Sequence, residues 1–363
     1  MQQFDGAEAT GAPQVLASPA RETPAVSVIM TAYNSAAYIE AALRSIMDQT
    51  LREIEIIVVD DASSDGTAEV LARLATEEPR LCVLTHEQNL GPALGRNRAL
   101  EAARAPYVAV LDSDDLAPPE RLARQKAWLD SHPATVLLAG SVRLIDAEGR
   151  HIRTRRRARD AIATRWMARF NMPIVHPTAM FRRHMPGKKP LAYDPDLQVA
   201  QDYDLVAQAL DLGEAVALAE VLVHYRVHGT SLTGTRWRDQ QKVASAIALR
   251  RQKADLPISI VEALEPFREA YFGMRPVDPH ALFDGLRQML AHDAKTAPGH
   301  RVWMKRQAAQ LAATAFHRSR VGKRRILQAF LGSGRDFLLP LTFRYLETKR
   351  LLPKPLSSDL NVG

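Results

Sequence analysis

Three carboxylates crowd into the stretch VLDSDD, where Asp112, Asp114 and Asp115 follow the apolar run YVAV. Like charges this close raise one another's pKa unless a positive group lies among them. Oxygen ligands of this kind suit a hard divalent cation, Mg²⁺ or Mn²⁺, which usually binds one or two carboxylates together with substrate phosphates. The alternative is an exposed acidic turn before the helix expected near Pro118, where the acids would interact favourably with the helix dipole.

The elements that must position this cluster alternate between strand and helix. Four short apolar runs, typical of buried strands, are separated by amphipathic segments typical of helices. The runs cover 25–33, 54–60, 81–86 and 107–112. This order predicts an α/β fold with a mostly parallel sheet covered on both faces. Ligands of such sheets bind beyond the carboxyl ends of the strands, so the polar residues that follow these runs are expected to form one acidic pocket.

The rest of the chain is predicted in less detail. The first helix is expected to begin with Asn34 or Ser35 as its cap. Helices are also expected at 120–131 and from Gln201, with strand-like segments between and after them, and the chain is mainly helical from Trp237. The basic segment RTRRRAR (153–159) has two interpretations, a contact to a phosphorylated carrier or a mobile loop, and the loop is favoured.

Composition indicates a globular protein of a reducing compartment. Of 363 residues, 46% are hydrophobic and 25% charged, and Cys82 is the only cysteine. We expect a disordered tail over 1–23 without the features of a secretory signal, no transmembrane helix, and a cytoplasmic location. Nucleic-acid binding is not expected, because aromatic residues make up only 6% and are not interleaved with basic ones.

The order of the motifs identifies a family resemblance. VSVIMTAYNSAAYIEAALRSI, IEIIVVDDASSDGT, GPALGRNRAL and YVAVLDSDD follow one another, and VHPTAMFRR, AQDYDLVAQA and HYRVHGTSL continue the series. As an ordered set they resemble family 2 glycosyltransferases, which have the GT-A fold, a Rossmann-like sheet flanked by helices. The resemblance covers roughly 24–232. It implies a catalytic domain over 24–235 and leaves a basic, mainly helical region over 236–363.

The resemblance also implies roles for individual residues. Asp202 matches the general base, Asp114 and His228 the metal site, and His176 a contact to acceptor or diphosphate. The family often has a glutamate before the base, whereas this chain has Gln201. The nucleotide-sugar site is expected to comprise Thr31, Tyr33, Asn34, Asp61, Arg96, Asn97, Asp112 and Ser113. Within it, Thr31 and Tyr33 would line the base pocket, Asp61 would bind the base, and Asp112 would face the ribose. Asp65 is expected to brace a loop, and Asp204 is expected to cap a helix. For Arg96 and Asn97 the alternative role is to stabilise the nearby loops.

Sugar transfer has physical requirements that fit this set. A nucleoside diphosphate leaves when charge on its β-phosphate is stabilised, as a divalent metal does, and the acceptor hydroxyl needs a base. One base opposite the leaving group gives inversion, whereas a glycosidase needs two flanking carboxylates. The expected function is therefore an inverting transfer from a nucleotide-diphosphate sugar, with UDP favoured because an Asp suits the N–H of uracil, and with dTDP and GDP open. The acceptor is expected to be a glycan or lipid-linked glycan of the cell envelope or an exopolysaccharide.

Two other functions remain as alternatives. One is a catalytically silent nucleotide-binding or scaffold protein of the same fold. The other is a sugar-phosphate nucleotidyltransferase, which would require a Gly-rich phosphate loop where this chain reads TAYNSAAY. Between Arg301 and Arg350 there are twelve Lys/Arg against two acids. This basic end is expected either to lie on the anionic inner face of the plasma membrane or to be a packed helical region with a basic surface.

Overall fold

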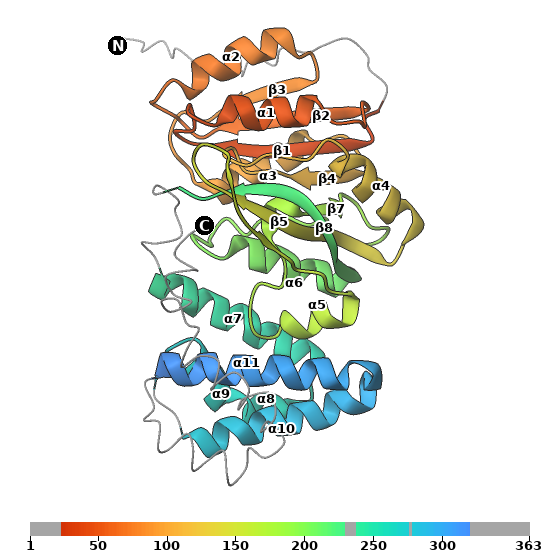
Figure 1. Cartoon of the computed structure of the whole chain (residues 1–363), viewed down its shortest axis with the longest axis vertical. Coiled ribbons are helices and arrows are strands. Elements are labelled where there is room, and N and C mark those ends of the chain that lie inside the picture. The colour runs from red at the N-terminus through yellow and green to blue at the C-terminus, as the bar shows by residue number, and fades with distance from the viewer. Residues whose placement is uncertain (1–22, 229–236, 276–277, 320–363) are drawn as a thin grey trace, which may run out of the picture.

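The computed structural model describes residues 23–228, 237–275 and 278–319, and Figure 1 shows a sheet at one end of the molecule and a group of helices at the other. The strands follow the order β3-β2-β1-β4-β7-β5-β6, and β8 pairs with β5. Their bounds are β1 (Val26–Ala32), β2 (Ile54–Asp60), β3 (Leu81–Thr85), β4 (Tyr107–Val110), β5 (Thr135–Ile145), β6 (His151–Arg155), β7 (Met180–Arg182) and β8 (Glu214–Arg226).

The sheet is mostly parallel, as predicted. β1 runs parallel to β2 and β4, β2 runs parallel to β3, and β5 runs parallel to β8. β7 lies between β4 and β5 and is antiparallel to both, so β4 and β5 run in the same direction. β6 is antiparallel to β5. The carboxyl ends of β1, β2, β4, β5 and β8 therefore meet at one edge of the sheet.

Helices cover both faces of the sheet because its central strands are apolar on both sides. Every residue of β2 and β4 is buried. One core cluster packs β1 against α1 (Ile39–Met47), α2 (Thr67–Glu77) and α4 (Arg121–Ser131), and another packs the opposite face against α3 (Pro92–Ala102) and α6 (Gln201–Leu212). Each buried Leu, Ile or Val contributes roughly 1.5–3 kcal/mol before the entropy of ordering is subtracted.

A helical region follows the sheet, as predicted. Its helices are α7 (Trp237–Asp255), α8 (Ile258–Ala263), α9 (Glu265–Tyr271), α10 (Pro279–Thr296) and α11 (Arg301–Ser319), with the short η3 (Pro298–His300) before α11. Its core also takes Trp166, Met167 and Phe170, which belong to or follow α5 (Ala161–Met167). The helical core is thus shared with the segment before residue 236. Among the described residues no helix combines the length and the apolar character needed to cross a membrane.

Two local predictions were wrong. Neither Asn34 nor Ser35 caps α1, which begins at Ile39, because Asn34 adopts φ 50° and both residues bond other loops instead. The basic segment is not simply a loop: Arg153–Arg155 belong to β6, paired with β5. The predicted tail up to residue 22, the turn at 229–236 and the basic segment from 320 onward lie outside the described residues.

Candidate functional site

The ends of β4 and β8 meet at the acidic cluster. Asp114 Oδ2 lies 2.8 Å from His228 Nε2, although the two residues are 114 positions apart. Asp112 Oδ1 accepts a hydrogen bond from Arg96 Nη2 at 3.1 Å, which brings α3 to the same place. The side chains of Asp112 and Asp114 remain 32% and 29% exposed. The predicted convergence of strand ends on an acidic site is therefore present in the fold.

The backbone around Asp114 and His228 is clamped. Leu116 and His224 exchange two backbone hydrogen bonds of 3.0 and 2.8 Å. Arg226 donates its N–H to Asp115 Oδ1 and its Nε–H to the Asp114 carbonyl, both at 2.8 Å. The guanidinium of Arg226 also lies 4.9 Å from the centre of the Tyr38 ring. The centre of the His228 ring lies 4.9 Å from the same ring centre of Tyr38. Arg226 and Tyr38 were not singled out in the sequence, although Arg226 stands two positions from His228 in HYRVHG.

The donor set at this point fits a divalent cation. A carboxylate oxygen and an imidazole nitrogen that already face each other are suitable ligands for Mn²⁺, and Mg²⁺ uses the same carboxylates with substrate phosphates and water. No group of three or more His, Cys, Asp or Glu gathers for a metal within the described parts of the chain. A metal at Asp114 and His228 would therefore take its remaining ligands from a substrate or from water.

The crowding of the three acids is relieved in three different ways. Asp112 faces Arg96 and Asp114 faces His228. Asp115 is buried, and its Oδ2 has no hydrogen-bond partner among the described residues. Burial, followed by the charges of Asp114 and Asp112, raises the pKa of Asp115 well above its ordinary value. Asp115 braces the end of β8 by accepting the Arg226 N–H.

Arg96 pairs with Asp112 and also acts electrostatically on Asp202. Burial alone would lower the pKa of Arg96, but Asp112, Tyr193 and Asp202 together outweigh it and raise that pKa. Its guanidinium lies over the Tyr193 ring, 5.5 Å from the ring centre. Tyr193 was missed in the sequence, where LAYDPDLQ carries no pattern that marks it. Arg96 thus supplies positive charge to both Asp112 and Asp202.

The two acids at the start of α6 have separate environments. Burial raises the pKa of Asp202, against the opposing effects of the Tyr203 N–H, which donates to Asp202 Oδ1 at 2.8 Å, and of Arg96. Asp204 instead bonds Arg250 of α7 and Gln208, both at 2.6 Å, so its predicted role as a cap is wrong. Gln201, where the family often has a glutamate, is buried and bonds the Leu197 carbonyl.

The loops on the predicted base side are tied to one another. Asn34 Oδ1 accepts the Ser64 N–H at 2.9 Å, and Asp65 receives the N–H of Ala36 and Thr67, so Asp65 braces this loop as expected. Asp61 accepts the N–H groups of Leu90 and Gly91 at 2.9 and 2.8 Å and also contacts His86 Nδ1. Thr31 lies at the end of β1, and Tyr33 after it is 49% exposed.

The remaining candidates lie in or beneath the same site. Ser113 Oγ lies 2.8 Å from Ser35 Oγ, which links the acidic loop to the loop after β1. Asn97 exchanges two hydrogen bonds with the backbone of Tyr193, so it holds the loop under Arg96. His176 is buried, and its Nε2 lies 2.9 Å from the Tyr193 hydroxyl. Burial and then Arg96 lower the pKa of His176 well below its ordinary value, so it is neutral.

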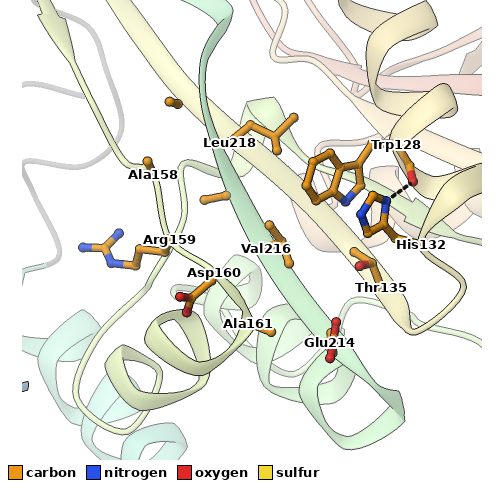
Figure 2. Close-up of a pocket in the computed structure, with 12 residues that line it drawn as sticks. Trp128, His132, Thr135, Ala158, Arg159, Asp160, Ala161, Glu214, Val216 and Leu218 are labelled. Carbon is orange, nitrogen blue, oxygen red and sulfur yellow. Dashed lines mark hydrogen bonds between the residues drawn. The ribbon is translucent and has the colours of Figure 1, made fainter. Parts of the chain in front are cut away.

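A separate pocket lies at the opposite ends of β5 and β8. It measures about 540 Å³, and its lining includes Trp128, His132, Thr135 and Glu214. Figure 2 shows Trp128 and His132 on one side of the β8 ribbon and Arg159 on the other. The Trp128 and His132 rings are stacked, with centres 4.0 Å apart. None of the predicted site residues lines this pocket, since Thr135 and Glu214 begin strands whose far ends carry the acidic site.

Comparison with known proteins gives a family and a fold. The family model "Glycosyl transferase family 2" matches residues 27–186. The chain is 32% identical over 220 residues to the putative teichuronic acid biosynthesis glycosyltransferase TuaG of Bacillus subtilis, covering 60% of this chain and 85% of that one.

Two solved structures share the fold. TarS of S. aureus in complex with UDP-GlcNAc has a TM-score of 0.55 at 19% identity, covering 88% of this chain and 91% of that chain. The mannosyltransferase PcManGT of Pyrobaculum calidifontis in complex with GDP-Man and Mn²⁺ has a TM-score of 0.51 at 23% identity, covering 90% and 91%. With the ordered motifs, the clamped acidic site and the extent of the match to TuaG, the chain belongs to glycosyltransferase family 2.

Proposed function

We propose that this glycosyltransferase moves a sugar, with inversion at the anomeric carbon and with the help of a divalent metal, from a nucleotide-diphosphate sugar to an acceptor hydroxyl. The observation that carries the proposal is the arrangement at one edge of the sheet. Asp114 faces His228 there, and Arg96 pairs with Asp112 and favours the ionised form of Asp202. This arrangement supports the proposal of one place for a metal-bound diphosphate and another for a base.

Each side chain then has a defined task. Asp114 and His228 would hold the Mn²⁺ or Mg²⁺ ion, which stabilises charge on the departing diphosphate. Asp112 would orient the ribose, and Asp202 would accept the proton of the attacking hydroxyl. Asp204 is turned away and paired with Arg250, so one carboxylate serves the acceptor side. A single base opposite the leaving group supports direct displacement and inversion.

The donor is proposed to be a UDP-sugar. The exposed Tyr33 ring is available to stack on a base, and Asp61, buried at the end of β2, is the proposed acceptor for a base N–H. Proteins that share the fold differ in their donors: TarS was solved with UDP-GlcNAc and PcManGT with GDP-Man and Mn²⁺. These complexes support a nucleotide-sugar and a divalent metal as a class, and direct titration with UDP, dTDP and GDP distinguishes the nucleotides.

The acceptor is proposed to be a glycan or lipid-linked glycan in cell-envelope or exopolysaccharide synthesis. The name of the relative TuaG, which refers to teichuronic acid biosynthesis, supports a polysaccharide pathway. Such acceptors are assembled at a membrane. We therefore place the enzyme in the cytoplasm, attached peripherally to the inner face of the plasma membrane through its basic C-terminal region.

The test is calorimetric titration of UDP, dTDP and GDP into the full chain, with and without Mn²⁺. One nucleotide is expected to bind in the presence of Mn²⁺ and to lose its metal-dependent binding in Asp114→Asn and after chelation with EDTA. Asp284→Asn, which removes an exposed acid of α10, is the matched control and is expected to bind like the wild type. Absence of nucleotide binding in the wild type under both conditions would overturn the proposal in favour of a silent scaffold protein.

A further inference from the structure

Five arginines between residues 153 and 159 form a cluster without carboxylate partners. The arginine cluster consists of Arg153, Arg155, Arg156, Arg157 and Arg159. Arginines just outside it are paired: Arg150 binds Asp146 and Glu148, and Arg165 binds Asp255. Among the described residues, no carboxylate forms an ion pair with any member of the cluster. The adjacent Asp160 is already used by His300 and by the N–H of Ala163.

Four members of the arginine cluster, Arg153, Arg155, Arg157 and Arg159, are close enough to repel one another. Arg155, Arg157 and Arg159 are half-buried, whereas Arg153 and Arg156 are exposed. Burial first, and then the charges of Arg155 and Arg159, lower the pKa of Arg157 to about 9. Burial followed by a neighbouring arginine also lowers the pKa values of Arg155 and Arg159. A bound anion would relieve this repulsion.

The arginine cluster begins beside the donor site. Arg155 is in register with Val142 of β5, and Tyr225 of β8 is in register with the nearby Leu144. Burial, and then Asp115, Asp112 and Asp114, raise the pKa of Tyr225, while Arg155 opposes the rise. Tyr225 therefore lies under the influence of both the acids and Arg155. One aromatic side chain links the acidic cluster to the first half-buried arginine.

The other end of the arginine cluster reaches the helical region. Arg157 is influenced by Tyr271 of α9. Its N–H donates to Ser141 Oγ at 3.0 Å, and Arg159 and Ala217 of β8 exchange backbone hydrogen bonds of 2.7 and 2.8 Å. In Figure 1 the connection from β6 to α5 descends from the sheet towards the helices. The backbone of the cluster is thus anchored before any ligand arrives, which lowers the entropy lost on binding.

The chemistry of the arginine cluster favours phosphate over other anions. Guanidinium groups bind phosphate oxygens through two parallel hydrogen bonds. A sugar carboxylate brings one negative charge, whereas a diphosphate or a run of phosphodiesters brings several, which matches five arginines gathered in seven positions. In the proposed function the donor diphosphate binds at Asp114 and His228, which leaves the cluster for the second substrate.

We infer that the arginine cluster is the acceptor site of this enzyme and binds phosphate groups of the acceptor, either the diphosphate of a lipid-linked glycan or the phosphodiesters of a glycan chain. The inference rests on the proposed function and adds to it the class of acceptor. Phosphate bound along Arg155 and Arg157 would hold the acceptor near the end of β8, whose neighbouring residues carry the donor site.

The experiment titrates phosphate probes into the full chain already saturated with UDP and Mn²⁺. A short oligo(glycerol phosphate) represents phosphodiesters and geranylgeranyl diphosphate represents lipid diphosphates, so the probe that binds identifies the source of the phosphate. Arg155→Gln/Arg157→Gln is expected to weaken that binding about ten-fold or more, because charge-assisted hydrogen bonds are lost. The variant Arg153→Gln/Arg156→Gln changes two exposed residues and is expected to leave the melting temperature unchanged. It should also weaken probe binding.

The matched control is Arg124→Gln/Arg287→Gln, which removes the same charge from exposed positions on α4 and α10. It is expected to change probe affinity less than about two-fold. If UDP binds normally but neither probe binds, or both cluster variants bind like the control, the inference is wrong while the proposed function stands. If UDP does not bind, both are wrong. A further outcome is that phosphatidylglycerol vesicles bind through the arginine cluster and are not displaced by either probe. The cluster would then be a membrane contact, and the inference would also be wrong.

Discussion

Arg96 is the residue on which the charge balance of the site depends. It donates to Asp112 at 3.1 Å and favours the ionised form of Asp202, while Tyr193 supports its guanidinium from beneath. Asp202 is the proposed base, and burial raises its pKa above the ordinary value. The site therefore combines a desolvated carboxylate, which is a stronger base than a solvated one, with a nearby cation that keeps it ionised.

Replacement of Asp202 tests the base directly. Asp202→Asn keeps the contact to the Tyr203 N–H but cannot accept a proton, so sugar transfer is expected to fall roughly 10²–10⁴-fold. Nucleotide binding, measured by calorimetry, should remain at the wild-type level. The wild-type rate should decline on acidification as Asp202 is protonated, beginning above the range of an ordinary aspartate, and this decline should be absent from the residual rate of the variant. A wild-type rate in Asp202→Asn would assign the base elsewhere.

Replacement of Arg96 tests how Asp202 is kept ionised. Arg96→Gln removes the positive charge that lowers the pKa of Asp202, so the acid side of the pH–rate profile is expected to move to higher pH. Arg96→Lys keeps the charge and should restore much of the profile, while its loss of the planar contact to Asp112 weakens donor binding. Equal displacement of the profile in both variants would show that packing on Tyr193, rather than charge, is responsible.

The site residues differ in how far the sequence could predict them. Asp112, Asp114, Arg96, Asp202 and His228 belong to ordered motifs, and the structure brings them together. Tyr193 carries no motif and became visible only through its packing under Arg96. The true partner of Asp204 is Arg250 on another helix, and such pairings between distant positions cannot be read from local spacing.

Among the elements, α3 approaches the sheet most closely at Gly95. A Cβ at Gly95 would lie 2.7 Å from Thr31 Cγ2 and 3.8 Å from Val59 Cγ1. Thr31 is the last residue but one of β1 and belongs to the predicted base pocket. The absence of a side chain at Gly95 therefore allows α3 to pack directly against β1 at Thr31. The packing of α3 thus affects the shape of the predicted base pocket.

Gly95→Ala is expected to destabilise the protein by about 1–2 kcal/mol. Overpacking against Thr31 costs about 1–3 kcal/mol, and the better helix propensity of alanine recovers up to about 1 kcal/mol. Urea denaturation measures the change, and a weaker affinity for the nucleotide should accompany it because Thr31 must move. Gly299→Ala is the control, since its Cβ would meet nothing within 4 Å. Equal stability of the two variants would show that α3 shifts freely.

The strands were predicted better than the boundaries of the helices. β1, β2 and β4 are buried on both faces, so their sequences are continuous apolar runs that are easily recognised. The start of α1 was misplaced because Asn34 and Ser35 are good caps in isolation, yet Ser64 and Ser113 bind their side chains. β6 was hidden because its sequence HIRTR has one apolar residue, Ile152, and so lacks the apolar alternation on which recognition depends.

At the scale of the whole molecule, a buried polar contact ties the sheet end to the helical region. Asp293 of α10 accepts hydrogen bonds from Trp166 Nε1 at 2.8 Å and from Arg169 Nη1 at 2.9 Å. Asp293 is 1% and Arg169 8% exposed. Trp166 and Phe170 enter the same core as α8–α11, so this contact forms where segments before and after residue 236 share one interior.

Asp293→Ala is expected to lower the free energy of unfolding by about 3 kcal/mol, because it removes the nearer of the two carboxylates that pair with the buried Arg169 and leaves only Asp255, at 3.5 Å. Asp284→Ala, on the same helix but in an exposed pair with Arg287, should change it by less than about 1 kcal/mol. Urea denaturation followed by tryptophan fluorescence measures both. Similar stabilities for the two variants would show that the helical region does not depend on this contact.

The separation of the proposed metal ligands Asp114 and His228 along the chain sets the earliest time at which the proposed metal site can form. These residues are 114 positions apart, and at about 5–20 residues per second a ribosome needs roughly 6–23 s to add that length. β1 to β4 pair early through short crossings, whereas β8 must close a long loop before its end reaches the acids. A nascent chain that stops before β8 would hold the parallel half of the sheet but would lack one of the two proposed metal ligands, so donor binding reports that the catalytic sheet has been completed.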